Sequence, residues 1–500
     1  MKWVILKSES DHAMTTDTSQ TAKPARPAMA RYQAARRAHW DALARRLDHW
    51  RSWGGYYHRR LQTVYGYVVA PGLRVLELGC GTGDLLAAVR PAVGVGVDFS
   101  GEMIQRAQAR HAALRFIQAD VLELDLPESF DVIILSDLIN DVWDVQTVFE
   151  CVARHALPHT RVILNTYSRV WEPPLHLAER LGLAKPVLHQ NWLTVDDIAN
   201  LLNLTELEII RHWQEIIWPF DTPVLTVVFN RVLARLWPFS HLSLTNFIVA
   251  RPKPRAVPLP EEPLVSIIIP ARNEAGNIPQ IFERVPRMGR GVELVFVEGH
   301  STDQTAEAIE QAMAAHPDWR CQFHRQTGVG KGDAVRLGFQ HARGEALMIL
   351  DADLTMPPED LPRYYAVLRS GKAELVNGVR LVYPMAGQAM QFLNLVGNRF
   401  FSIAFTWLLG QPVKDTLCGT KALWKRDYDL IVANRGYFGD FDPFGDFDLL
   451  FGAAKLNCKI VDLPIRYQAR TYGATNIQRW KHGWLLLKMV LFALRWMKWI

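Results

Sequence analysis

The feature that most constrains the fold of this chain is a repeated alternation of short, β-branched apolar runs with longer helical patterns. The alternation occurs on both sides of the stretch RPKPRAVPLPEEP at 251–263, which contains five prolines. Proline fixes φ and lacks an amide proton, so this stretch excludes a helix or a central strand. Strands that alternate with helices favour parallel sheets built from βαβ units. We therefore expect an α/β protein with two doubly wound, Rossmann-like domains.

The apolar runs also predict where the strands lie. In the first half they cover 74–78, 93–98, 114–120, 131–137, 161–167 and 245–251. In the second half they cover 265–271, 292–298, 345–353 and 373–380.

A chain of 500 residues exceeds what one hydrophobic core usually supports, so several domains are expected. The first residues are rich in Thr, Ser, Ala and Pro, which is typical of disorder. We predict a disordered lead, two domains, a linker between them and a C-terminal helix. The disordered lead covers 1–30, and the two domains cover 31–250 and 264–479. The linker between them covers 251–263, and the C-terminal helix covers 480–500.

Cysteine usage and apolar segments narrow the class of protein. The five cysteines are widely scattered and form no CxxC pair, which argues against a disulfide framework or a zinc knuckle and suits a reducing cytoplasm. The opening MKWVILKSES is too briefly apolar for a signal peptide. No segment offers the roughly 18 uncharged apolar residues that a spanning helix needs. A net charge of +5 indicates no particular partner.

A glycine-rich loop in the first half predicts a nucleotide site. In VLELGCGTGDLL, Gly79, Gly81 and Gly83 follow a predicted strand and precede a helix, where bare backbone lets a ligand approach closely. Asp98 closes the next strand, where a carboxylate can accept both hydroxyls of a ribose. Asp120 closes the third strand, within reach of an adenine amine. The spacing alone fits dinucleotides as well.

These features together resemble the class I S-adenosylmethionine-dependent methyltransferases over about 50–250, and ELGCGTG favours them over dehydrogenases. The resemblance implies that S-adenosylmethionine is bound by the glycine loop and the acids at the strand ends. The methionine part would be surrounded by Glu77, Gly79, Gly81 and Gly83, the ribose bound by Asp98, and the adenine flanked by Asp120.

The methyl acceptor is not evident from the sequence. SDLINDVWD follows the fourth strand and supplies Asp137, Asn140 and Asp141 as acceptor-side candidates, with capping of the next helix as the alternative. The zone 26–60 carries nine arginines. Such a run indicates either a nucleic-acid surface or the solvated face of a helix, and we expect the latter. No nucleic-acid partner is expected.

In the second half, acidic residues follow the predicted strands. Glu274 comes after the first strand, Glu298 ends the second, and Asp351 and Asp353 end the third. In an extended strand, residues i and i+2 point to the same side, so the two aspartates need a cation. Lys331, between two glycines, is a further cation. Acids at strand ends can bind a base and a ribose, and the lysine with a divalent metal can neutralise a diphosphate.

This order of motifs resembles glycosyltransferase family 2 from residue 263 to about 481, and its distal motifs resemble the polyprenyl-phosphate glycosyltransferases, including dolichyl-phosphate mannose synthases. The resemblance implies a GT-A-type fold, a nucleotide sugar donor and a polyprenyl phosphate acceptor. Asp351 and Asp353 would hold Mg²⁺ or Mn²⁺. The donor would be bound by Pro270, Arg272, Glu274, Glu298, Lys331, Asp333 and Asp351.

The resemblance further implies that Asp353, Asp415, Arg380 and Arg470 are catalytic. A lipid phosphate is already anionic and needs charge neutralisation, which the two arginines supply. A hydroxyl acceptor would instead need a carboxylate base, for which Asp415, Asp446 and Asp448 are the alternatives. Val379 and Lys421 depart from the family pattern.

The C-terminal segment predicts a basic amphipathic helix. Lys481, Lys488 and Arg495 recur every seven residues, Lys498 follows one turn later, and the remaining surface is mainly apolar. Three cations make spanning a bilayer unfavourable, at about 2.5–3.5 kcal/mol each. A helix in the plane of the membrane interface avoids this cost. The alternative is a helix packed on the enzyme with its basic stripe in water.

Taken together, the sequence predicts a bifunctional enzyme at the cytoplasmic face of a membrane. It would transfer a sugar, with inversion, to a polyprenyl phosphate and methylate a second acceptor. The alternatives are transfer to a lipid or saccharide hydroxyl, with the first domain a non-catalytic S-adenosylmethionine-binding scaffold, and a nucleic-acid methyltransferase with an unrelated fusion partner.

Overall fold

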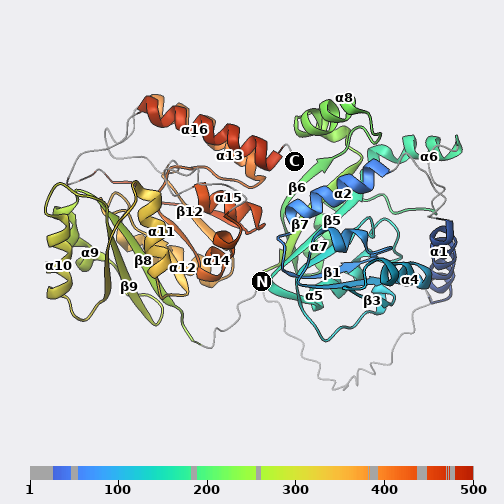
Figure 1. Ribbon diagram of the computed structural model, residues 1–500, viewed down its shortest axis with the longest axis horizontal. Helices are drawn as coiled ribbons and strands as arrows, with labels where there is room; N and C mark the ends of the chain where they lie inside the picture. The colour runs from blue at the N-terminus through green and yellow to red at the C-terminus, as the bar shows by residue number, and fades with distance from the viewer. Residues whose placement is uncertain are drawn as a thin grey trace, which may run out of the picture.

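The computed structural model describes residues 26–46, 55–181, 188–254, 261–380, 382, 392–435, 447–468, 470, 472 and 479–498. Within these residues the chain forms two α/β halves that lie side by side along the long axis of Figure 1. Each half is built on one seven-stranded sheet with helices on its faces. The predicted fold class is confirmed.

The first sheet has the strand order β3-β2-β1-β4-β5-β7-β6. Its strands are β1 (Arg74–Leu78), β2 (Val93–Asp98), β3 (Arg115–Gln118), β4 (Phe130–Ser136), β5 (Ala156–Tyr167), β6 (Leu207–Glu215) and β7 (Thr245–Pro252). All pairings are parallel except those of β7, which runs antiparallel to β5 and β6. The sequence reading missed β6, because this edge strand is only partly buried and carries charged residues.

Helices cover both faces of this sheet (Figure 1). They are α1 (Arg26–Arg46), α2 (Gly55–Val68), α3 (Asp84–Ala88), α4 (Gly101–Arg110), α5 (Val145–Arg154), α6 (Glu172–Arg180) and α7 (Val195–Leu204). Between β6 and β7 the chain forms a helical excursion made of α8 (Pro223–Thr226), η4 (Val227–Val232), η5 (Leu233–Arg235) and η6 (Phe239–Leu242). We call residues 223–242 the β6–β7 excursion.

The second sheet has the order β10-β9-β8-β11-β13-β12-β14. Its strands are β8 (Leu264–Ala271), β9 (Gly291–Glu298), β10 (Arg320–Arg325), β11 (Ala346–Ile349), β12 (Leu375–Val379), β13 (Lys421–Trp424) and β14 (Ile460–Pro464). β13 is antiparallel to β11 and β12, and the other pairs are parallel. The sequence reading missed β10, β13 and β14, which are short or only partly apolar.

The strand predicted over 345–353 is too long. β11 ends at Ile349, so Asp351 and Asp353 lie in the turn that follows and do not alternate along a strand. Leu354, next to them, has a left-handed φ of 51°. The reason given for placing both carboxylates on one side was therefore wrong, although the turn still brings them to the same sheet edge.

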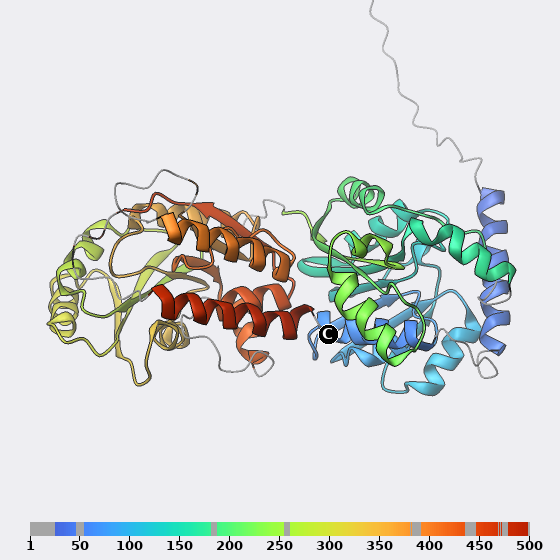
Figure 2. The ribbon, with the colours of Figure 1, turned by 90° about the horizontal axis from the view of Figure 1, so that it is seen from above.

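The helices of the second half are α9 (Ile278–Arg284), α10 (Thr305–Ala315), α11 (Lys331–His341), α12 (Leu361–Arg369), α13 (Phe392–Leu409), α14 (Lys425–Ala433), α15 (Phe447–Lys455) and α16 (Arg479–Ala493), which continues as η11 (Leu494–Lys498). The C-terminal helix packs on the second half, and α13 lies beside it (Figure 2). Four of its buried apolar side chains belong to a hydrophobic core of the second half, namely Leu486, Met489, Ala493 and Met497. Among the described residues, no helix is long and apolar enough to span a bilayer.

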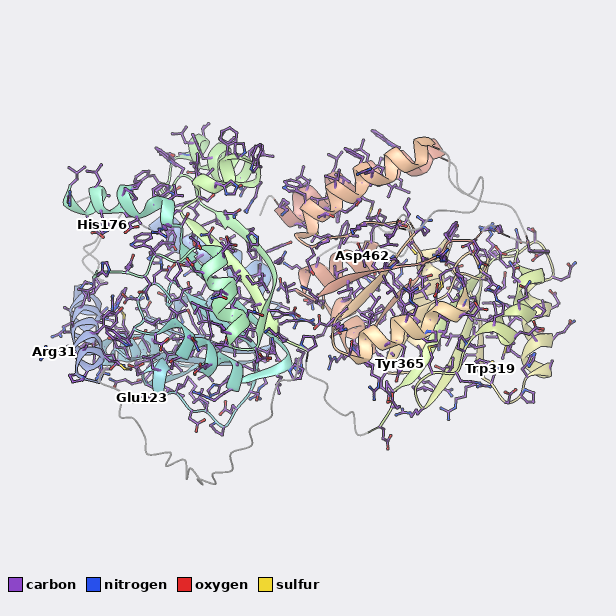
Figure 3. All side chains as sticks on the ribbon, turned by 180° about the vertical axis from the view of Figure 1, so that it is seen from behind. Arg31, Glu123, His176, Trp319, Tyr365 and Asp462 are labelled. Carbon is purple, nitrogen blue, oxygen red and sulfur yellow. The ribbon has the colours of Figure 1, made fainter. Side chains whose placement is uncertain are left out.

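The two halves meet at the open edges of their sheets, and the contact is polar and buried. Lys459, just before β14, reaches the Ile209 carbonyl of β6 at 3.4 Å. Glu374 forms ion pairs with Arg161 of β5 at 3.2 Å and with Arg251 of β7 at 2.8 Å. Figure 3, from behind, labels Asp462 on the edge strand β14 beside this seam.

Candidate functional sites

The glycine loop after β1 has the backbone that a bound nucleotide requires. Gly79 and Gly83 have φ of 72° and 75°, a region that favours glycine. A Cβ on Gly83 would lie 2.6 Å from the Phe116 ring, and one on Gly79 would lie 2.9 Å from Leu138. Gly81 donates its amide to Asp98 Oδ2 at 2.9 Å. The loop and the end of β2 therefore form one rigid unit.

Glu77 and Asp98 are buried carboxylates beside this loop. Burial raises the pKa of both, well above the ordinary value for Glu77. Among the described residues, Glu77 Oε2 is buried with no hydrogen-bond donor. An unpaired buried acceptor is costly, and a cationic ligand with N–H donors would relieve it. S-adenosylmethionine, which carries an ammonium and a sulfonium, fits these residues.

Helix α1 covers the outer edge of the same site, which the sequence reading did not anticipate. Gln33 donates to Asp120 Oδ2 at 2.8 Å, while Asp120 Oδ1 accepts from the Leu122 amide at 3.0 Å. Asp41 accepts from the Ser100 hydroxyl next to Asp98. The predicted adenine-side carboxylate is thus already bonded to α1.

Two arginines of the 26–60 zone correct the expectation of a solvated face. Arg36 is buried and pairs with Asp141, which also accepts from Trp40 Nε1 at 2.6 Å. Arg60 is buried against Glu215 at 3.0 Å. Burial of an arginine requires a paired carboxylate, and these partners lie too far away in sequence to be foreseen.

The acceptor-side candidates after β4 do not cap the next helix. Asp144 caps α5, with its side chain accepting from the Thr147 amide at 3.2 Å. Asp137 has a left-handed φ of 55°. Its Oδ1 accepts from the Tyr57 hydroxyl at 2.8 Å and from Asn165 Nδ2 at 2.6 Å.

The Asp137 carboxylate is therefore fixed through one of its two oxygens. Both donors go to Oδ1, so Oδ2 has no protein donor among the described residues. Burial raises the pKa of Asp137 to about 7. The next residue, Leu138, lies against Gly79, so the Asp137 carboxylate lies beside the glycine loop. The Tyr167 ring packs against Tyr57, and the Trp192 ring packs against Tyr167. A carboxylate with these properties is suited to accept a proton.

In the second half, Arg470 joins two of the predicted acids. Its guanidinium lies 2.9 Å from Glu274 Oε1 through Nη1 and 2.6 Å from Asp353 Oδ2 through Nη2. Burial raises the pKa of Glu274, and the Arg470 charge acts in the opposite direction. Asp353 Oδ1 also accepts from the Thr355 hydroxyl at 2.8 Å. A distal loop is thereby tied to the ends of β8 and β11.

Lys331 pairs with Asp351 at 2.6 Å. Gly419 packs closely against this pair, because a Cβ at this position would lie 2.0 Å from Lys331 Nζ and 2.2 Å from Asp351 Oδ2. The sequence reading missed Gly419. Asp333, on the same helix as Lys331, instead accepts from the Gly328 amide at 3.1 Å.

The two aspartates suit a hard divalent cation. Carboxylate oxygens are the ligands that Mg²⁺ and Mn²⁺ prefer, and Mg²⁺ usually takes one or two of them with water and substrate phosphate. Within the described ranges, no cluster of three His, Cys, Asp or Glu side chains forms a complete metal site. Two carboxylates therefore fit the protein ligands of such an ion, whose remaining coordination positions would be open to phosphate oxygens.

Both carboxylate oxygens of Asp415 are hydrogen-bonded to Arg380. Its two oxygens accept from the guanidinium at 2.7 and 2.9 Å, and Oδ2 also accepts from the Arg380 amide at 3.1 Å. Burial alone would raise the pKa of Asp415, but the Arg380 charge and these bonds hold it below its ordinary value. A carboxylate in this state is a poor proton acceptor at neutral pH. Its geometry is that of a residue that positions Arg380.

The remaining predicted residues lie around this edge. Pro270 is the second-last residue of β8, Arg272 is exposed in the turn after the strand, and Glu298 ends β9, where it accepts from the Ser301 amide. Of the alternative bases, Asp448 pairs with Arg435 at 2.6 Å. Asp446 lies outside the described residues.

Comparison with known families matches both halves. Residues 266–430 match the family model of glycosyl transferase family 2, and residues 70–206 match that of a methyltransferase domain. Glycosyltransferase AglJ of Haloferax volcanii is 30% identical over 232 residues, which are 46% of this chain and 71% of that protein.

Two further relatives match the second half. The undecaprenyl-phosphate 4-deoxy-4-formamido-L-arabinose transferase of Shewanella sediminis is 38% identical over 112 residues, covering 21% of this chain and 34% of that protein. The dolichol-phosphate mannosyltransferase of Pyrococcus furiosus is 25% identical over 240 residues, covering 47% and 64%. The chain therefore spans about a third of the first of these two and just under two thirds of the second.

Solved structures similar to the chain include methyltransferases. An S-adenosylmethionine-dependent methyltransferase from Mesorhizobium loti is 23% identical, with 40% of this chain and 98% of that chain covered and a TM-score of 0.31. A possible histamine N-methyltransferase from Thermotoga maritima is 16% identical, with 43% and 99% covered and a TM-score of 0.33.

Proposed function

This chain belongs to glycosyl transferase family 2 through its C-terminal half and carries a methyltransferase domain in its N-terminal half, and we propose that it makes a lipid-linked sugar. In this proposal a nucleotide sugar is the donor and a polyprenyl phosphate is the acceptor. Two relatives are named for transfer to undecaprenyl phosphate or dolichol phosphate, which supports this acceptor. We assign the two activities to 31–250 and 264–479.

The observation that carries the proposal is the meeting of two cation–carboxylate pairs at one sheet edge. Lys331 pairs with Asp351, and Arg470 pairs with Asp353. Asp351 and Asp353 would hold Mg²⁺ or Mn²⁺, which would neutralise the charge on the departing nucleoside diphosphate. Lys331 then binds the same diphosphate, and Arg470 becomes available to the acceptor.

The state of Asp415 favours a phosphate acceptor over a hydroxyl. A hydroxyl needs a base, and Asp415 is engaged by Arg380 through both oxygens. A phosphate monoester is anionic at neutral pH and needs cations, for which Arg380 and Arg470 are suited. An attack from the face opposite the leaving group inverts the anomeric centre, so we propose a single inverting displacement.

In the first half, we assign S-adenosylmethionine to the glycine loop with Glu77 and Asp98, and proton removal from the methyl acceptor to Asp137. Oδ1 of Asp137 is fixed by two donors, so its Oδ2 would take the proton. Because the sugar acceptor is a membrane lipid, we place the enzyme at the cytoplasmic face of a membrane.

A donor screen tests the glycosyl transfer. The full chain is incubated with Mn²⁺, undecaprenyl phosphate and each common nucleotide sugar, and release of nucleoside diphosphate is followed. We expect release with one donor, dependent on the lipid and lost in Asp353→Ala. Glu359→Ala is the matched control, because Glu359 forms an exposed pair with Arg284. Release without lipid, or equal release by Asp353→Ala, would contradict the proposal.

A further inference from the structure

The β6–β7 excursion exposes an unusual amount of apolar surface. Val224 is 73% exposed and Leu242 is 52% exposed, at the two ends of the segment. Other exposed apolar side chains between them are Leu225, Val227, Val228, Val232, Leu236, Trp237 and Phe239. Exposed apolar groups this dense mark a contact surface, because water-facing segments seldom keep so many.

The excursion lies on the same side of the molecule as α13 and α16. All three lie along the top of Figure 1, and they face the viewer in Figure 2. α13, α16 and η11 add exposed Phe400, Ile403, Trp407, Trp484, Leu491 and Trp496. The Trp407 indole donates to the Arg235 carbonyl at 3.3 Å, which joins α13 to the excursion across the seam. The two apolar surfaces therefore form one face, built by both halves.

The three segments that build this face carry cations and no carboxylate, and Asp221, which precedes the first of them, pairs with Arg59. No Asp or Glu occurs in 222–260, in 392–409 or in 479–498. Exposed cations flank the apolar side chains, namely Arg231, Arg399, Lys488 and Arg495. Apolar groups ringed by cations and tryptophans match the chemistry of an anionic bilayer surface. Two copies of such a face would repel each other.

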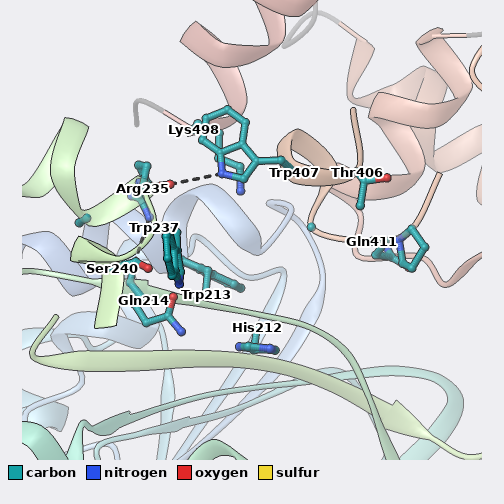
Figure 4. A pocket seen from close by; sticks show the side chains of 13 residues that line it. His212, Trp213, Gln214, Arg235, Trp237, Ser240, Thr406, Trp407, Gln411 and Lys498 are labelled. Carbon is teal, nitrogen blue, oxygen red and sulfur yellow. Dashed lines mark hydrogen bonds between the residues drawn. The ribbon is translucent and has the colours of Figure 1, made fainter. Parts of the chain in front are cut away.

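A cavity of about 340 Å³ opens in this face at the seam (Figure 4). Its lining includes Trp213, Arg235, Trp237, Trp407 and Lys498. Arg235 is almost fully buried, and its Nε has no hydrogen-bond acceptor among the described residues.

Cations outnumber carboxylates around the cavity. Arg211 lies close behind it, and the nearby carboxylate Glu215 is already shared by Arg60 and Arg235. Burial lowers the pKa of Lys498 to about 7, and the nearby Arg235 and Arg211 charges act in the same direction. An anion in the cavity would relieve this repulsion.

We propose that this face docks on an anionic phospholipid bilayer, with the β6–β7 excursion of the methyltransferase half as a contact in its own right and a headgroup phosphate seated in the seam cavity. This goes beyond the proposed function, which places the enzyme at a membrane but names no surface that contacts the lipid. Both halves would then be held at the same lipid surface, so a lipid-linked product could reach both sites without entering water.

Flotation of the full chain with vesicles tests the apolar contact. The probe is phosphatidylcholine vesicles with and without phosphatidylglycerol. We expect Val224→Glu with Leu242→Glu to lower vesicle partition at least tenfold. The control is Leu204→Glu, since Leu204 is 58% exposed but lies near the other end of β6, nine residues of strand away from the excursion. Unchanged partition in the double variant would overturn the proposal, as would absence of partition in the wild type.

A second arm tests the cavity. Lys498→Gln is expected to reduce the preference for phosphatidylglycerol over phosphatidylcholine severalfold, while Lys425→Gln on α14, the control, leaves it unchanged. Equal preference in both variants would refute the headgroup site. A dimer in solution that Val224→Glu with Leu242→Glu dissociates, without vesicle binding, would assign the face to a second copy instead.

The outcome is separable from the proposed function. The Val224 and Leu242 variant should still transfer sugar to undecaprenyl phosphate dissolved in detergent, because neither residue belongs to the catalytic sites. Loss of flotation with intact transfer in detergent supports the docking face. Intact flotation with no transfer would contradict the glycosyl transfer alone.

Discussion

Replacement of Glu374 by alanine is expected to separate the two halves of the chain. Glu374 is 5% exposed at the seam, and its Oε1 lies 3.2 Å from Arg161 and 2.8 Å from Arg251. Its Oε2 accepts from the Lys459 amide at 2.6 Å. The variant leaves two buried guanidinium groups without their shared carboxylate.

The magnitude follows from that geometry. Removing one partner of a buried ion pair costs about 3–5 kcal/mol, because the remaining charge is desolvated and unpaired. Here that charge is Arg161, since Arg251 keeps Glu208 at 2.7 Å. That free energy corresponds to roughly two to four powers of ten in the equilibrium between associated and separated halves. The control is Glu359→Ala, whose exposed pair with Arg284 is worth about 0–1 kcal/mol.

The assay uses a protease site introduced into the linker at 255–260. After cleavage, the wild-type halves should elute together in gel filtration, whereas those of Glu374→Ala should elute apart. Denaturant unfolding of the uncleaved chain measures the accompanying loss of stability. A loss below about 1 kcal/mol, with halves that still elute together, would refute the reasoning.

Acid should reproduce the effect in the wild type. Burial alone would raise the pKa of Glu374, but Arg161 and Arg251 hold it below its ordinary value. The stabilisation is therefore complete above the ordinary carboxyl pKa of about 4.3 and is lost as pH falls through the lowered value. Wild type and variant should converge in stability over that acidic range. A difference that stays constant through that acidic range would contradict the assignment.

Three further substitutions address the sites. Gly419→Ala should reduce glycosyl transfer at least tenfold with little loss of stability, because the added Cβ would displace Lys331 from Asp351. A normal steady-state rate of transfer would refute this. Asp137→Asn should abolish methyl transfer and leave calorimetric S-adenosylmethionine binding intact; the wild-type rate should rise with pH up to about 7, where the carboxylate becomes ionised. Asp415→Asn should weaken acceptor binding through Arg380, seen as a raised KM, and a change confined to the pH profile of kcat would mark it as a base.

The parts of the fold that the sequence predicted are those with strong local patterns. β1, β2 and β8 are continuous apolar runs, and they lie within one residue of their predicted ranges. β6 and β10 are edge strands with polar faces, and β13 is a four-residue strand, so none carries a distinct period. Their places are decided by pairing with strands distant in the sequence.

The candidate sites follow the same division. Asp98 and Glu298 could be located because they close strands, and the carboxyl ends of neighbouring parallel strands share an edge. Gln33, Gly419 and Glu374 could not, since each acts through a partner that only the folded chain brings near. Their partners lie far away in the sequence, as with Gln33 and Asp120, whose separation is 87.

The most direct test of the account is the mass of the lipid product. Undecaprenyl phosphate is incubated with the donor found in the screen, first without and then with S-adenosylmethionine, and the lipid is extracted for mass spectrometry. We predict a phospholipid heavier by one sugar residue, whose formation Asp353→Ala abolishes and Asp137→Asn does not. A lipid of unchanged mass beside consumed donor would contradict the central claim.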